Sequence, residues 1–143
     1  MWRKALTLDR DRRALLVEAA WYLVRVWLTL RLLPFSTLAA SLDRDRVRRG
    51  VVPADIAAVR WAVEAAARHL PISLTCLPQA FAASWMLMAR GGRPLLHYGV
   101  AKRENCFEAH AWVEQDGKPV VGHREAGRFT ELACFPAGKS APS

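Results

Sequence analysis

Cys76 is the first residue of this sequence whose surroundings suit nucleophilic chemistry. It stands in the run Thr75-Cys76-Leu77-Pro78-Gln79-Ala80. Because proline is favoured at the first position of a helix, this run predicts that Cys76 lies at a helix start. The positive end of the helix dipole stabilises a thiolate there, and the free backbone N–H groups of the first turn can hold an oxyanion. A small buried thiol without a catalytic role is the alternative interpretation.

His110 is the second such residue, and it lies in the alternating run 107–114. Alternation along a strand places four side chains on one face, namely Glu108, His110, Trp112 and Glu114. The alanines on either side of His110 leave room for a substrate or a helix end, so we expect the imidazole to be accessible. A helix-start cysteine followed by a strand histidine is the order of a Cys–His dyad, in which the imidazole takes the thiol proton.

The elements that must position these residues follow from periodicity and from glycine and proline. Helical spacing predicts helices over 14–33, 53–70 and 78–90, ended by Pro34, Pro71 and Gly91-Gly92. Alternation predicts strands over 95–101, 107–114, 118–122 and 128–135, with Asp116-Gly117 as a two-residue hairpin turn. Helices followed by an antiparallel sheet define an α+β domain.

Composition limits the function classes. The chain has 143 residues and a formal net charge of +8, which favours acidic partners. The basic runs lack interleaved aromatic residues and match no known module, so we expect no nucleic-acid binding. Three cysteines without a CxxC pair predict neither a zinc site nor a disulfide framework. The N-terminus does not have the pattern of a secretory signal, so we expect a cytoplasmic protein with reduced thiols.

The run Cys76-Leu77-Pro78-Gln79-Ala80, the run 107–114 and Asp116-Gly117 together resemble the leader peptidases of lasso-peptide biosynthesis. These are bacterial cysteine proteases with a transglutaminase-like (papain-like) core, and the resemblance covers roughly 71–136. It implies residues 51–136 as the catalytic core, preceded by an apolar helix and basic loop over 1–50. We expect residues 137–143 to be a disordered tail.

The resemblance also implies a function. Cys76 would attack the bond between leader and core in a precursor peptide, and His110 would shuttle the proton. A small leader-binding recognition protein would present the substrate, and a separate lasso cyclase would close the freed core. The resemblance implies no cofactor and no metal.

A third member of the site is harder to assign. The family carries an acidic residue about twelve positions after the histidine, and that position is Gly122 in this sequence. With a two-residue turn, His123 would lie opposite His110, with Val121 and Glu125 on the diagonals. The group that orients the imidazole is therefore a backbone carbonyl, the side chain of His123 or Glu125, or a residue from elsewhere. Glu125 is the preferred candidate, because a carboxylate fixes the tautomer of the imidazole. Gln79 and Trp112 are candidates for substrate binding.

Three alternatives stay open. The same dyad can transfer an acyl group to an amine, as in a transglutaminase or an acetyltransferase. The chain can instead be a non-catalytic basic adaptor for an acidic peptide. The apolar helix over 14–33 is interrupted by charges and fails as a membrane span, but its exposed residues can contact a partner protein or the membrane surface.

Overall fold

The computed structural model describes residues 2–42, 53–72, 75–123, 127 and 129–135. Within these ranges the helices are α1 (Trp2–Leu32), α2 (Phe35–Ser41), α3 (Pro53–His69) and α4 (Cys76–Ala89). The strands are β1 (Leu95–Arg103), β2 (Cys106–Gln115), β3 (Lys118–Val121) and β4 (Thr130–Phe135). Helices therefore precede strands along the chain, and the predicted α+β class is confirmed. The predicted boundary at residue 50 and the predicted tail over 137–143 lie outside the described residues.

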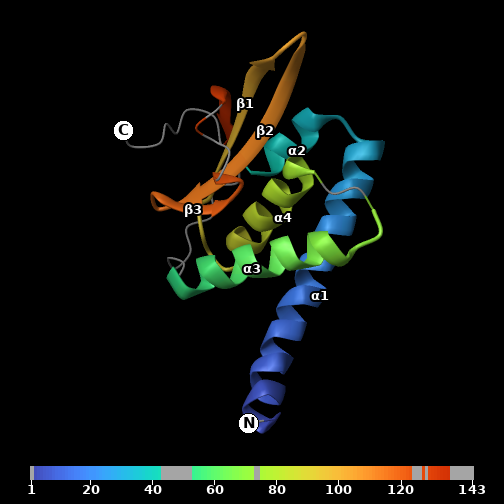
Figure 1. Cartoon of the computed structure of the whole chain (residues 1–143), viewed down its shortest axis with the longest axis vertical. Helices are drawn as coiled ribbons and strands as arrows, with labels where there is room; N and C mark the ends of the chain where they lie inside the picture. The colour runs from blue at the N-terminus through green and yellow to red at the C-terminus, as the bar shows by residue number, and fades with distance from the viewer. Residues whose placement is uncertain (1, 43–52, 73–74, 124–126, 128, 136–143) are drawn as a thin grey trace.

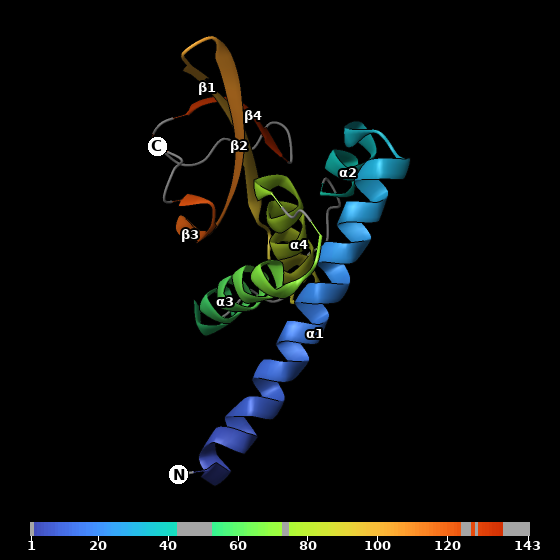
Figure 2. The ribbon, with the colours of Figure 1, turned by 45° about the vertical axis from the view of Figure 1, so that its right-hand side comes forward.

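The strands form one antiparallel sheet in the order β3-β2-β1-β4. Helix α4 is the central element, because it contacts α1 and α3 as well as β1, β2 and β3. The N-terminal part of α1 extends away from this body in both views (Figures 1 and 2). Helix α4 packs on β2, so the helix that begins with Cys76 is a direct neighbour of the strand that carries His110.

The core between helices and sheet follows the predicted periodicities. Its largest fully buried side chains include Phe81, Leu23, Leu38, Met86, Leu87 and Leu96. On β2, Ala111 and Val113 are buried in this core. Because side chains alternate across a strand, His110 and Trp112 belong to the other face of β2.

Helix α1 is longer than predicted, since it begins at Trp2 rather than near residue 14. Ala19, Leu23 and Val26 are fully buried in the core. Arg90, at the end of α4, donates to both carboxylate oxygens of Glu18 at 2.7 and 2.8 Å. None of the helices in the described part of the chain is long and apolar enough to cross a membrane.

We expect Leu23→Ala to lower the free energy of unfolding by about 3 kcal/mol, because the removed atoms leave a cavity in the core. Leu23 is 0% exposed, whereas Trp21 on the same helix is 65% exposed. Trp21→Ala is the matched control and should change stability by less than about 0.5 kcal/mol. Urea denaturation followed by circular dichroism measures both. Equal effects would contradict the packing of α1 on the core.

Candidate active site

Cys76 is the first residue of α4, as the sequence predicted. Thr75 precedes it in an extended conformation, with φ −76° and ψ −170°, and its side chain makes no capping hydrogen bond. Pro78 lies in the third helical position, not the first, so the predicted helix start at residue 78 is two residues late. Proline fits there because the N–H groups of the first turn have no partner within the helix. The first turn thus leaves the backbone N–H groups of Cys76 and Leu77 without partners inside the helix.

His110 is held between two aromatic rings. The imidazole stacks on Phe129 with ring centroids 4.9 Å apart and on Trp112 at 6.1 Å. It is 8% exposed, so the accessible histidine predicted from its alanine neighbours is wrong. Stacking on both rings limits rotation of the imidazole and fixes the direction in which its two nitrogens point.

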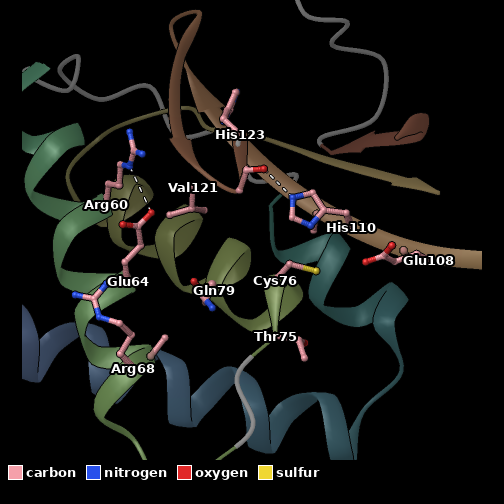
Figure 3. Close-up of a pocket in the computed structure, with 14 residues that line it drawn as sticks. Arg60, Glu64, Arg68, Thr75, Cys76, Gln79, Glu108, His110, Val121 and His123 are labelled. Atoms are coloured by element: carbon pink, nitrogen blue, oxygen red, sulfur yellow. Dashed lines mark hydrogen bonds and ion pairs between the residues drawn. The ribbon is translucent and has the colours of Figure 1, made fainter. Parts of the chain in front are cut away.

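The Nε2 atom of His110 lies 2.7 Å from the backbone carbonyl oxygen of Gly122. A carbonyl oxygen only accepts hydrogen bonds, so Nε2 carries the proton and Nδ1 keeps its lone pair in the neutral ring. In Figure 3 the sulfur of Cys76 lies on the side of the imidazole away from this dashed hydrogen bond. This arrangement leaves Nδ1 available as the base for the thiol proton.

Gly122 reaches His110 because the hairpin register is irregular. Gln115 pairs with Lys118 and Glu114 with Pro119, but a shift of one residue then pairs Val113 with Val121. The two-residue turn at Asp116-Gly117 is confirmed, with φ values of 53° and 74°. The predicted pairing of His123 with His110 is wrong, because it assumed an uninterrupted ladder. Gly122, which corresponds to the acid of the family that the motifs resemble, thus supplies a main-chain carbonyl instead of a carboxylate.

Cys76 and His110 line one cavity of about 700 Å³ (Figure 3). Gln79 lines it too, one turn after Cys76. Trp112 is not among the lining residues and instead packs against the ring of His110. Glu125 lies outside the described residues. The structure therefore brings together three of the predicted site residues.

Helix α3 supplies charged residues to the wall of the cavity, and these were not predicted from the sequence. Arg60, Glu64 and Arg68 all line it, and Arg60 pairs with Glu64 at 3.4 Å. Their spacing of four residues puts them on one side of α3, opposite the apolar side that predicted the helix. This four-residue spacing is the sequence pattern from which the charged side of the helix could have been predicted. Phe129, by contrast, has no sequence pattern that links it to His110.

His123 also lines the cavity, and burial lowers the pKa of its imidazole below the ordinary 6.5. The unfolded chain therefore binds this proton more readily than the folded one, and stability falls as the pH drops through about 6.5. We expect His123→Gln to reduce the loss of thermal stability between about pH 7.5 and about pH 5. Melting temperatures across this range test the prediction. The exposed His69→Gln control should keep the wild-type slope, and an unchanged slope in His123→Gln would contradict it.

The fold and the site define a class of protein: an α+β domain with a Cys–His pair, the cysteine at a helix start and the histidine on a strand. A sequence model described as the transglutaminase-like superfamily (Transglut_core3) matches residues 19–134. The chain therefore belongs to the transglutaminase-like superfamily, which includes cysteine peptidases and transglutaminases. The match begins in α1, well before residue 71 where the motif resemblance begins, and ends in β4. Comparison with curated proteins and with solved structures finds no match.

Proposed function

We propose that this chain is a cysteine peptidase that removes the leader from a lasso-peptide precursor. One observation carries the proposal. The helix-start thiol of Cys76 and the imidazole of His110 share one cavity, and the Gly122 carbonyl holds the ring in the tautomer of a base. The motif resemblance in the same two segments selects leader removal among the reactions of the superfamily.

The reaction begins when Nδ1 of His110 takes the proton from Sγ of Cys76. The thiolate attacks the carbonyl carbon of the bond between leader and core, and the backbone N–H groups at the start of α4 stabilise the oxyanion. The imidazolium then gives its proton to the departing amine, which becomes the new amino terminus of the core. Water, deprotonated by His110, hydrolyses the leader thioester and frees Cys76.

The residues that line the cavity favour the proposal of a peptide substrate. Arg68 and Glu64 from α3 line the same cavity as Cys76, with the Glu64 carboxylate turned toward Arg60, and Glu108 lies beside His110 on β2 (Figure 3). Charges of both signs around a nucleophile suit a polar, extended backbone with acidic and basic side chains. Ala109, which precedes His110 on β2, is exposed and also lines the cavity.

Helix α1 supports the proposal that a partner presents the substrate. Its outer surface exposes four large apolar side chains, Val17, Trp21, Leu28 and Leu32. Exposed apolar patches of this kind mark interaction surfaces. We expect this surface to bind the leader-binding recognition protein, and the lasso cyclase to act on the released core. Retention on anionic liposomes, lost in Trp21→Ala, would instead assign the surface to peripheral membrane contact.

Mass spectrometry of the precursor peptide, incubated with this chain and its leader-binding partner, tests the proposal. We expect a single cut, with one water added across the products and a free amino terminus on the core. Cys76→Ala should leave the peptide whole, while Cys106→Ala, which changes an exposed thiol, should cut at the wild-type rate.

Two other outcomes would overturn leader hydrolysis. A product that carries an added amine in place of water would assign acyl transfer to the same dyad. A peptide that stays whole with the wild-type chain, yet is still bound, would support the non-catalytic adaptor.

A further inference from the structure

A second group of reactive side chains lies at the edge of the sheet, away from the cavity. His97 lies on β1, and Glu131 and Cys134 lie on the neighbouring strand β4. His97 pairs with Cys134 in the ladder, and Gly99 pairs with Glu131 across a register irregularity. This irregularity brings one nitrogen, one oxygen and one sulfur atom from the three residues within 4.8 Å of one another.

The imidazole of His97 is in contact with two carboxylates. Its Nε2 lies 2.7 Å from Oε1 of Glu114, and its Nδ1 contacts Oε1 of Glu131. A neutral imidazole has a single N–H group, so it can donate to only one of them. When the proton at Nε2 is donated to Glu114, the lone pair of Nδ1 faces the Glu131 carboxylate, so Nδ1 and this carboxylate can act together as ligands of one cation.

Cys134 belongs to the same cluster, because its Sγ lies within 4.8 Å of the His97 nitrogen and of the Glu131 carboxylate oxygen. A cation at this point would offset the negative charges of Glu131 and Glu114, and it would displace the thiol proton of Cys134, as metal binding to cysteine does.

We propose that Nδ1 of His97, the carboxylate of Glu131 and Sγ of Cys134 bind one divalent transition-metal ion of the zinc class. Nitrogen, oxygen and sulfur donors are the set that Zn²⁺ takes, whereas Mg²⁺ and Ca²⁺ prefer oxygen alone. Three protein ligands leave the fourth tetrahedral position to water. Binding releases one proton, from Cys134.

Glu114 completes the arrangement. A histidine that ligates a metal commonly donates its other N–H to a carboxylate, which fixes the tautomer and the ring orientation. Glu114 accepts from His97 in this way at 2.7 Å. The sequence predicted no metal because it lacks a CxxC pair, and this cluster does not depend on such a pair, since its histidine and cysteine are brought together by strand pairing.

The proposed ion is separate from the peptidase chemistry. The ring of His97 stacks on Trp112 at 5.5 Å, and Trp112 stacks in turn on His110. The metal would therefore tie β1 to β4 and stiffen the wall behind the catalytic imidazole, without contact with the substrate. Loss of the metal site and loss of the peptidase are distinguishable for this reason.

Cobalt binding to the full chain tests the site. The double variant Cys76→Ser, Cys106→Ser leaves Cys134 as the single thiol, since the chain has 3 cysteines. We expect one equivalent of Co²⁺ to give a thiolate-to-cobalt charge-transfer band, to protect Cys134 from alkylation, and to be displaced by Zn²⁺. Adding Cys134→Ser should remove the band, and Glu131→Gln should weaken binding by at least about 10-fold.

Two controls make the test specific. Glu108→Gln and His69→Gln change a carboxylate and a histidine elsewhere and should bind cobalt as the double variant does. Glu131 is 46% exposed at its side chain, so its replacement leaves the core intact and separates ligation from folding. Absence of the band in the double variant, or a band of full strength in Glu131→Gln or in His97→Asn, would overturn the proposal.

Discussion

Cys76→Ala and His110→Ala are each expected to lower the rate of leader cleavage by about 10⁴-fold or more, because members of a nucleophile–base pair act as a unit. Without Cys76 no thioester forms. Without His110 the thiol proton has no acceptor and the departing amine has no donor. The double variant should be no slower than the slower single variant, since either change alone removes the covalent route.

Single-turnover cleavage with the leader-binding partner measures these rates, and alkylation of Cys76 gives a readout that needs no substrate. His110→Ala should slow alkylation of Cys76 by iodoacetamide at neutral pH but leave that of Cys106 unchanged. Circular dichroism checks that each variant is folded. Cleavage within about 10-fold of wild type in His110→Ala would exclude the imidazole as the base.

Gly122→Asp is expected to abolish cleavage and to lower the free energy of unfolding by about 3 kcal/mol, although it places an acid where the family that the motifs resemble has one. Gly122 has φ +80°, a conformation that costs free energy for any other residue. An added Cβ would lie 2.6 Å from the carbonyl oxygen of Ala111 and 3.0 Å from Cβ of Trp112. The backbone must shift to relieve these contacts, and the carbonyl that holds His110 shifts with it.

Gly117→Ala is the matched control. Its φ of +74° is similar, but an added Cβ meets nothing within 4 Å. It should cost about 1 kcal/mol and keep the wild-type cleavage rate. Melting temperatures and cleavage rates, taken where all variants are folded, separate the two effects. Full activity in Gly122→Asp would show that the Gly122 carbonyl does not orient the base.

The elements of the fold could be predicted closely because their signals are local. Proline and glycine end the helices at Pro34, Pro71 and Gly91, and Asp116-Gly117 joins two alternating runs. Each of these features depends on backbone conformations that a few neighbouring residues decide. The long extension of α1 toward Trp2 was missed, because residues before Ala14 are charged and lack an apolar stripe.

The candidate site, like the fold, was predicted from the sequence only in part. The sequence itself determines that Cys76 starts a helix and that His110 lies on a strand, through the proline near the thiol and the alternation around the imidazole. Only the tertiary structure decided what holds the imidazole, because a one-residue register shift beyond Glu114 brings the Gly122 carbonyl to it. Strand pairing likewise decided that His97 meets Glu131 and Cys134. Contacts between residues far apart in sequence depend on register and packing, which no local pattern encodes.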